Sequence, residues 1–383
     1  MRILLHCWNT LCQEDLLAAL QKMGHQVTSL YYVQRNYEHE TEYEALLEQK
    51  LSGQDYDVVM SFNYFQANAN ACFRKNVPYI SWIFDSPTLN LFSKTVRYPT
   101  NYIFHFDGAM VERLKALGAQ HVYNVPLGVN ALRVANVPCG EKQYDVSFVG
   151  SLYGEKDQYP ALRECLPAGV QGYLDGLLEV QHLLYGCNLL EELCTPEIMK
   201  QVMEHCHFQE DSNLLATDAF LLANVFLGIH LTATERRKYL QELAKRFSLT
   251  VFTREEKAVI PGAAMRPGVD YQNGMVQVFK ESRINLNITL RTIETGVPLR
   301  AFDIMGAGGF LLTNYQAQLA DYFTPGEDFV QFDSESGLLE AVEYYLHYEE
   351  EREQIARNGQ NKIQRYYTYE KILDYIFSTV FDR

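Results

Sequence analysis

Short β-rich runs alternate with amphipathic helical segments along most of the chain, and this alternation restricts the possible folds more than any other feature. Near the start, RILLHCW is followed by the helical DLLAALQKMG and then by QVTSLYY. Strands separated by helices of about ten residues predict parallel sheets with right-handed crossovers. The second half repeats the pattern, with strand candidates DVSFVG, SLTVFT, INLNITL, GFLLTN and DFVQF. We therefore expect an α/β fold with two facing, Rossmann-like, doubly wound domains.

The 383 residues are enough for two domains, since single cores stop growing well below that length. Val129–Tyr144 lacks clear periodicity, carries Pro and Gly, and is interpreted as a linker. A helical pattern from about 160 to 246 predicts an insertion after the first strand of the second domain. The last segment is read as two helices broken near Gly359. The expected parts are an N-terminal domain at 1–137, a C-terminal domain at 138–358 and a C-terminal helix at 359–383 that packs back toward the N-terminal domain.

Charge and hydropathy exclude several classes of protein. A formal charge of -15 argues against a general nucleic-acid or anionic-membrane binder, because both need a basic surface. The longest apolar run, Ala219–Leu231, is too short to cross a bilayer, which takes about 20 residues. The start resembles a strand rather than a signal peptide, and the eight cysteines include no CxxC pair. We expect a cytoplasmic protein with reduced cysteines and no metal centre.

The segment ETGVPLRAFDIMGAGGFLLTN (Glu294–Asn314) places charged residues at the start of an otherwise apolar helix. Pro298 suits the first helical position, and Gly296 allows the turn before it. Free amides and the helix dipole at such a tip favour an anion. Arg300 and Asp303 are three residues apart and share one helix face, where they could hold a diphosphate and a ribose. An ordinary surface pair between these two side chains explains the spacing equally well.

Other polar residues follow strands of the second domain. Gly150 ends DVSFVG and Ser151 follows it, where small residues allow close approach of a phosphate, and Lys156 lies within reach. A plain turn is the alternative interpretation. Asn287 alternates with apolar residues in INLNITL, and a buried asparagine needs hydrogen-bond partners. Arg291, just beyond that strand, adds a second cation.

In the first half, Asp85 follows the apolar strand ISWIF and precedes a Ser-Pro turn. It is a candidate base for an acceptor hydroxyl, although capping is the commoner role of an aspartate there. Asn9 lies in the first strand-to-helix turn, and His105 ends another strand. Both belong to the edge of the expected sheet at which ligands bind.

Several segments taken together resemble the CgeB-type (spore maturation protein) glycosyltransferases. The resemblance to their C-terminal half rests on DVSFVGSLYGE, TERRKYLQEL, LTVFT and SRINLNITLRTIETGVPLRAFDIMGAGGFLLTNY. The opening MRILLHCWNTLCQEDLLAALQKMGHQV, with SWIFDSP and VYNVPLGVN, is similar to the N-terminal domain that often precedes that half. The resemblance covers nearly the whole chain and is strongest from Ser282 to Asn314.

The resemblance implies a GT-B fold, with a nucleotide-sugar donor held by the second domain and an acceptor by the first. Asp303 would hold the ribose, and Thr253 lies where such folds hold the nucleobase through backbone groups. Ser151 stands where the wider group often has arginine, so Lys156 and the two arginines would carry the diphosphate charge. The implied donor residues are Gly150, Ser151, Lys156, Thr253, Asn287, Arg291, Gly296, Arg300 and Asp303, with Asp85, Asn9 and His105 on the acceptor side.

The expected activity is therefore metal-independent, cofactor-free transfer of a sugar from a nucleotide-diphospho-sugar, with a UDP-sugar favoured, to a hydroxyl-bearing acceptor. Two alternatives stay open at this point. A nucleotide-sugar epimerase on the same fold would need no separate acceptor. A binding or scaffold protein would retain the fold without turnover, and fold analogy alone does not separate the three.

Overall fold

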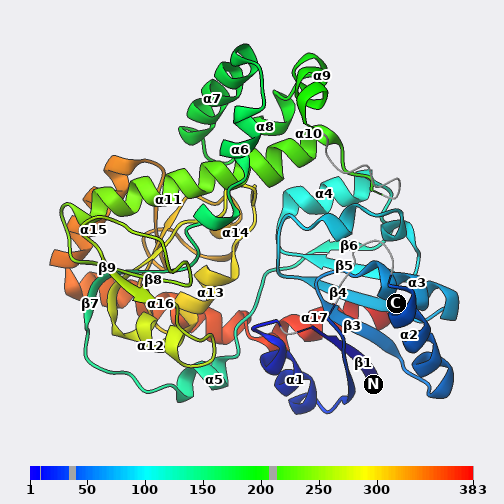
Figure 1. Ribbon diagram of the computed structural model, residues 1–383. Helices are drawn as coiled ribbons and strands as arrows, with labels where there is room; N and C mark the ends of the chain where they lie inside the picture. Colours follow the sequence, from blue (N-terminus) through cyan, green and yellow to red (C-terminus); the bar gives the residue numbers. More distant parts are fainter. Residues whose placement is uncertain (9, 34–39, 207–213, 383) are drawn as a thin grey trace. The chain divides into compact units, whose positions relative to one another are not determined.

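A computed structural model describes residues 1–8, 10–33, 40–206 and 214–382. The chain divides into two compact units. Unit 1 comprises 1–130, 210–216 and 366–383, and unit 2 comprises 131–209 and 217–365. Within the described residues each unit holds a six-stranded parallel sheet flanked by helices, so the expected pair of doubly wound domains is confirmed (Figure 1).

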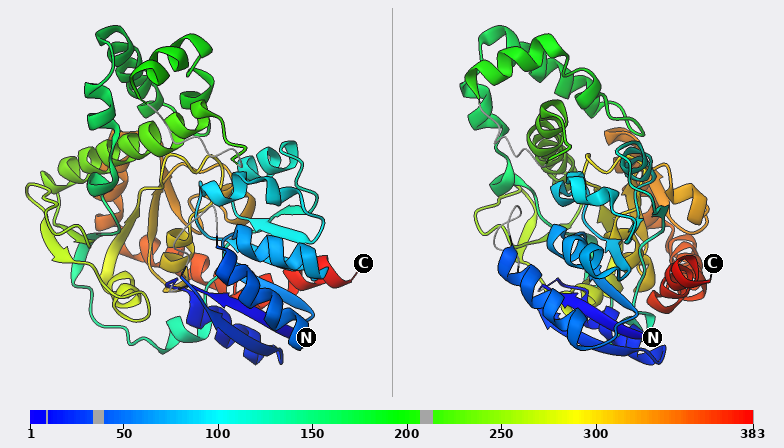
Figure 2. Two further views of the ribbon diagram at one scale, coloured as in Figure 1. Left: turned by 45° about the vertical axis from the view of Figure 1, so that its right-hand side comes forward. Right: turned by 90° about the vertical axis from the view of Figure 1, so that its right-hand side faces the viewer.

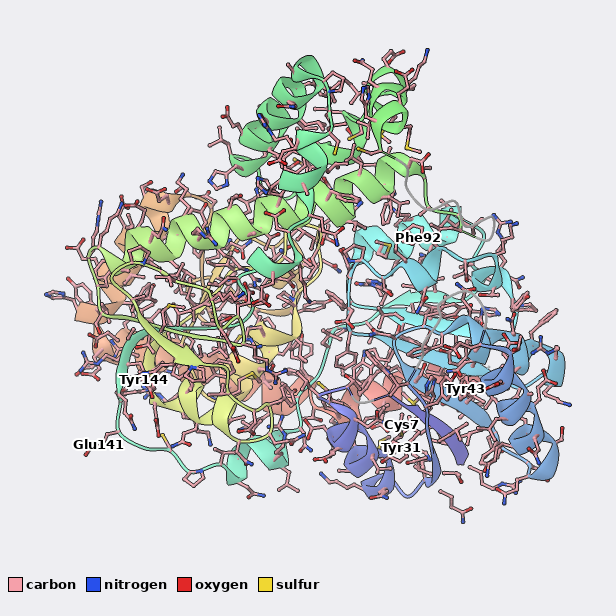
Figure 3. All side chains as sticks on the ribbon, in the orientation of Figure 1. Cys7, Tyr31, Tyr43, Phe92, Glu141 and Tyr144 are labelled. Carbon is pink, nitrogen blue, oxygen red and sulfur yellow. The ribbon has the colours of Figure 1, made fainter. Side chains whose placement is uncertain are left out.

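Unit 1 has the strand order β2-β1-β3-β4-β5-β6. Its central strands β3 and β4 are buried along their whole length, as expected for a parallel sheet covered on both faces. The edge strand β2 is largely open, and Tyr31 at its end is 68% exposed, whereas Cys7 at the end of β1 is buried (Figure 3). The elements are β1 (Arg2–Cys7), α1 (Gln13–Lys22), β2 (Gln26–Tyr31), α2 (Thr41–Gly53), β3 (Val58–Phe62), α3 (Gln66–Lys75), β4 (Tyr79–Ile83), the 3₁₀ turns η1 (Leu89–Phe92) and η2 (Lys94–Arg97), β5 (Asn101–His105), α4 (Gly108–Ala116), β6 (Val122–Asn124) and α17 (Tyr369–Phe381).

Unit 2 has the strand order β12-β11-β10-β7-β8-β9. Helices α7, α8 and α9 lie on the side of the long helix formed by α10, η4 and α11 that faces away from the sheet of this unit (Figure 2). The elements are α5 (Ala131–Asn136), β7 (Tyr144–Val149), η3 (Gly154–Lys156), α6 (Tyr159–Glu164), α7 (Ala168–His182), α8 (Leu189–Glu192), α9 (Pro196–His205), α10 (Asp218–Leu221), the π-helical η4 (Leu222–Leu227), α11 (Gly228–Ala244), β8 (Leu249–Thr253), β9 (Ala264–Pro267), α12 (Gly274–Glu281), β10 (Ser282–Asn287), α13 (Leu299–Gly306), β11 (Leu311–Asn314), α14 (Leu319–Tyr322), β12 (Val330–Phe332), α15 (Glu335–His347) and α16 (Glu349–Tyr366).

Unit 2 begins seven residues earlier than the linker pattern predicted, at Ala131 rather than at 138. The intervening segment forms α5 and is tied to unit 2 by two basic side chains. Arg133 donates to the carbonyl of Gln272 at 2.7 Å, and Lys280 donates to the carbonyls of Val134 and Val137. These hydrogen bonds place the segment with the second sheet.

The break expected near Gly359 is wrong. Helix α16 runs through this residue without interruption, and the return to unit 1 comes at Tyr366. A Cβ on residue 359 would lie 2.5 Å from the backbone oxygen of Asp328 and 3.2 Å from the sulfur of Met305. The glycine therefore permits close packing of a continuous helix rather than ending it.

Candidate functional site

The carboxyl ends of the unit 2 strands lie at one edge of the sheet, because all five strand pairings are parallel. The strand order reverses between β7 and β10, so the crevice beyond these two strands is the switch point at which such sheets bind ligands. The loop after β7, the end of β8 and the residues after β10 all lie at this edge. Helix α13 also begins there, since it follows β10 in a right-handed crossover.

The loop after β7 is wrapped around a carboxylate of the same chain. Glu255, two residues beyond β8, is 8% exposed, and its side chain lies in the concave face of this loop. One backbone conformation helps to form that curve, because Tyr153 is left-handed with φ of 61°. Glu255 Oε1 accepts from the Ser151 hydroxyl and from the amides of Leu152 and Tyr153 at 2.5, 2.5 and 2.8 Å, and Oε2 accepts from the Gly154 amide at 3.2 Å. Successive amides converging on one anion form a nest, the arrangement that also binds phosphate.

Arg236 of α11 spans the switch point. Its guanidinium donates to the carbonyl of Ser151 at 2.6 Å and to the carbonyl of Ile288, so it joins the loops that follow β7 and β10. The residue is 8% exposed, and its Nε has no hydrogen-bond partner among the described atoms. Burial lowers the pKa of this arginine, while the nearby carboxylates of Glu235 and Glu255 act in the opposite direction. A desolvated, incompletely paired cation at this point stabilises any anion that enters.

Further cations surround the loop. Lys156 is exposed, with Nζ 5.5 Å from the centre of the Tyr153 ring, and Arg236 lies 4.9 Å from the same ring. Arg237 Nη2 lies 3.6 Å from the position of a Cβ on Gly154. The predicted grouping of Gly150, Ser151 and Lys156 at the strand end therefore has the charge that a phosphorylated ligand requires.

The tip of α13 is less open than its sequence suggested. Gly296 is buried, and Arg300 and Asp303 pair with each other at 3.5 Å. Asp303 is 3% exposed and also accepts a hydrogen bond from the Tyr271 hydroxyl at 3.1 Å. Arg300 keeps 28% of its side chain exposed and contacts the sulfur of Met275. Arg300 can thus meet an incoming ligand, whereas Asp303 must exchange its present partners before it binds a ribose.

Arg291 has a structural role in place of the expected diphosphate contact. Its Nη2 donates to the carbonyl of Gln181, in the last turn of α7, at 2.6 Å and to that of Leu184, just beyond this helix, at 2.7 Å. Its Cζ lies 4.0 Å from the centre of the Tyr185 ring. Its side chain is 6% exposed. The nearby carboxylate is Glu235, whose pKa burial raises. Arg291 therefore fastens the helical insertion to β10.

Asn287 and Thr253 are also held within the fold. Asn287 is 4% exposed and donates to the hydroxyls of Thr289 and Thr313 at 3.0 and 2.9 Å. This asparagine is satisfied by neighbouring strands, and its amide is not directed at a ligand. The Thr253 hydroxyl accepts from the Glu255 amide at 3.3 Å, so it shapes the turn that presents Glu255 to the loop.

In unit 1, Asp85 remains at the carboxyl edge of its sheet. It is exposed and accepts from the Asn63 amide at 2.6 Å. The Asn63 side-chain oxygen in turn accepts from the backbone amides of Phe84 and Asp85 at 2.9 and 3.1 Å. Asp85 is therefore oriented by a neighbour and open to solvent, as a base for an acceptor would be.

The prediction that His105 contacts an acceptor disagrees with its position in the structure. It is fully buried, its Nδ1 accepts from the Asp107 amide at 3.0 Å, and burial lowers its pKa to about 4. A neutral histidine enclosed in this way does not touch a ligand at the surface. Asn9 lies outside the described residues.

Within the described parts of the chain, no group of three or more histidine, cysteine, aspartate or glutamate side chains is arranged to hold a metal ion. Among the same residues, no helix combines the length and apolar character that a membrane span requires.

The sequence interpretation missed the two residues at the centre of this edge, Arg236 and Glu255. A signal for Arg236 was present in TERRKYLQELAKRF, because Tyr239, Leu240 and Leu243 follow it by three, four and seven residues and so share its face of the helix, which is the buried face of α11. Glu255 lacked such a signal, since TREE after a strand reads as an exposed polar turn.

Comparison with known proteins agrees with this geometry. The family described as glycosyl transferase-like matches residues 236–378. A search of curated proteins gave no significant match. Anabaena HepE, solved in complex with UDP-glucose, is similar over 100% of both chains, at 10% identity and a TM-score of 0.57. Sucrose-phosphate synthase from Thermosynechococcus elongatus is similar over 100% of this chain and 99% of its own, at 8% identity and a TM-score of 0.56.

A third similar structure is assigned as a UDP-N-acetylglucosamine 2-epimerase from Listeria monocytogenes. It covers 99% of this chain and 95% of its own, at 10% identity and a TM-score of 0.51. The structural similarity over nearly the full chain establishes the fold, which is GT-B, and at these low identities it shows the fold alone. The family match adds that residues 236–378 are similar in sequence to the glycosyl transferase-like family.

Proposed function

We propose that this GT-B chain, with its glycosyltransferase domain at 236–378, transfers a sugar from a nucleotide-diphospho-sugar to a hydroxyl-bearing acceptor. The observation that carries the proposal is the convergence of loop amides, the Ser151 hydroxyl and buried Arg236 at the switch point of unit 2. This is the place and the chemistry that a diphosphate requires. The resemblance to CgeB-type enzymes is part of the same proposal.

The chemistry follows from charge. Cleavage of a sugar–diphosphate bond places negative charge on the departing nucleotide. Oriented amides and arginines that are already in place stabilise this charge without reorganising during the reaction. Arg236 is fixed by two carbonyls, and Arg300 and Lys156 are partly exposed cations at the same edge. These groups support leaving-group departure without a metal ion, which we include in the proposal.

UDP-sugars are the donors to test first. HepE was solved with UDP-glucose, and it shares the fold of this chain over its full length. For the acceptor, unit 1 offers Asp85 as a base, held by Asn63 and open to solvent. The acceptor itself is proposed only as a molecule with a reactive hydroxyl.

A thermal-shift screen of UDP-, GDP-, dTDP- and CDP-sugars tests the proposal, followed by release of the nucleotide with and without candidate acceptors. We expect one donor class to raise the melting temperature, and Arg300→Ala to remove that shift while leaving the apo protein folded. Arg283→Ala is the control, because Arg283 is the second residue of β10, near the opposite edge of the same sheet, and pairs with Asp145. A wild-type response from Arg300→Ala contradicts the assignment of this edge.

The similarity to the Listeria protein supports one alternative function, that of a nucleotide-sugar epimerase. A nucleotide-sugar epimerase would convert the donor with no acceptor present, whereas a transferase consumes donor only when an acceptor is added. If the protein binds a nucleotide but transfers no sugar with any acceptor tested, it is a binding or scaffold protein.

A further inference from the structure

The nest after β7 is already filled by an anion of the same chain. Its four donors are engaged by one carboxylate, that of Glu255. A diphosphate oxygen that binds the same donors needs the same positions, and two anions cannot share them without strong repulsion. An anion bound here must therefore displace Glu255 or bind elsewhere.

Two observations indicate that the nest is a site for exchange rather than a closed structural contact. Arg236 Nε is buried and has no partner in the described structure, although its guanidinium borders the loop. That atom could donate to a larger anion that reaches past the position of Glu255. The loop is also open to solvent on one side, since Gly154 and Lys156 are exposed. A ligand can enter from that side while the Glu255 side chain rotates out.

We propose that Glu255 is an internal competitor for the anion site of the loop at 151–154, and that the diphosphate of the donor binds by replacing its carboxylate. Glu255 keeps the four donors paired while the site lacks a ligand, so the loop does not collapse and its amides stay oriented. An incoming anion must break those hydrogen bonds before it binds, so Glu255 weakens its binding. The identification of the anion as a sugar donor rests on the proposed function, whereas the exchange does not.

Removal of the competitor should strengthen anion binding. The experiment uses the full chain with Glu255→Ala and Glu255→Gln and measures dissociation constants by isothermal titration calorimetry. The probes are inorganic pyrophosphate, UDP and uridine, which lacks a phosphate. Glu256→Gln is the matched control, because Glu256 is the next residue, is exposed and loses the same charge.

We expect Glu255→Ala to bind pyrophosphate and UDP about 10-fold more tightly than the wild type, since charge-assisted hydrogen bonds no longer have to be broken. Glu255→Gln should show a smaller gain, because its amide oxygen still accepts from part of the loop. Uridine binding should not change, and Glu256→Gln should match the wild type with every probe.

Unchanged or weaker pyrophosphate binding by both Glu255 variants, with wild-type melting temperatures, would overturn the proposal and leave Glu255 as a structural clamp. Should Glu255→Ala be unfolded, Glu255→Gln alone decides the question. The two proposals fail separately. Tighter pyrophosphate binding without turnover of any nucleotide-sugar retains the exchange and removes the transferase, whereas turnover without tighter binding does the reverse.

Discussion

A single buried side chain, Arg236, connects packing to chemistry in unit 2. Its guanidinium satisfies the carbonyls of Ser151 and Ile288, which follow the two strands at the switch point. Removing it leaves two carbonyls without their donor and removes the cation nearest the loop. The loss of the carbonyl contacts should lower the unfolding free energy, and the loss of the cation should lower the affinity for a nucleotide.

We expect Arg236→Lys to weaken UDP binding about 10-fold or more, because an ammonium group cannot donate to both carbonyls and to a ligand in one plane. Its unfolding free energy should fall by about 1–3 kcal/mol for the unpaired buried carbonyl. Urea unfolding followed by far-UV circular dichroism checks this value. Arg246→Ala, an exposed arginine just after α11, is the control. Wild-type affinity in Arg236→Lys would show that this residue serves packing alone.

Asp85 gives the corresponding prediction in unit 1. Asp85→Asn keeps an acceptor oxygen for Asn63 but cannot take a proton, so transfer should fall about 100-fold or more while UDP binding stays unchanged. Initial rates at saturating donor measure this effect. Asp55→Asn, whose side chain is 97% exposed in the wild type, should behave like the parent. Unchanged turnover would leave Asp85 as a structural residue.

Residue roles were predictable only where position along a strand determined them. Gly150 and Ser151 directly follow β7, so the pattern correctly placed them at the carboxyl edge of the sheet, and their contact with a ligand stays a prediction. Arg291 also follows a strand, but its direction depends on the carbonyls at the end of α7, more than 100 residues earlier in the chain. His105 shows the same limit, because its burial depends on packing around β5 that no local pattern encodes.

At the scale of elements, two glycines within helices differ in the space that surrounds them. Gly359 lies within α16 against the Asp328 carbonyl, where a Cβ would approach to 2.5 Å. Gly176 lies within α7, and a Cβ there would meet nothing within 4 Å. The same substitution should therefore change stability in opposite directions.

We expect Gly359→Ala to lower the unfolding free energy by about 1–3 kcal/mol through overpacking. Gly176→Ala should raise it by up to about 1 kcal/mol, since alanine favours the helix. Equilibrium urea unfolding followed by circular dichroism compares them. Equal stabilisation by both substitutions would mean that α16 is not packed against Asp328 as described.

Most strands could be predicted from alternation and β-branched residues, because those signals are local. Strand β9 was missed, since Ala264–Pro267 is mostly exposed and ends in a proline, which a sheet tolerates at its edge. Helix α5 was read as a linker because six residues are too few to show a helical period. What joins it to unit 2 is tertiary hydrogen bonding by Arg133 and Lys280.

At the scale of the whole molecule, the two units differ in their buried titratable groups. His6 and His105 belong to unit 1, and burial lowers the pKa of each to about 4 from an ordinary value of 6.5. In unit 2, burial lowers the pKa of His182 but raises that of the Glu235 carboxyl, and these two shifts oppose each other in acid.

Acid should therefore destabilise unit 1 more than unit 2. A depressed histidine pKa means that the unfolded chain binds the proton first, so the stability present above pH 6.5 is lost as the pH falls toward 4. Between pH 7 and 5 the loss is on the order of 2 kcal/mol for each histidine. Both tryptophans, Trp8 and Trp82, lie in unit 1, so their fluorescence reports that unit alone.

Urea titrations at pH 7 and pH 5 should show the tryptophan transition moving to lower urea by more than the far-UV circular dichroism transition, which follows both units. His6→Gln should reduce this pH-dependent shift by about half, because one of two comparable groups no longer titrates. His347→Gln, at an exposed position of α15, should leave the shift intact. If the two probes move together at pH 5, or if His6→Gln retains the full shift, proton uptake by the buried histidines does not control the acid stability of unit 1. The carboxylates of both units would then have to account for the acid sensitivity.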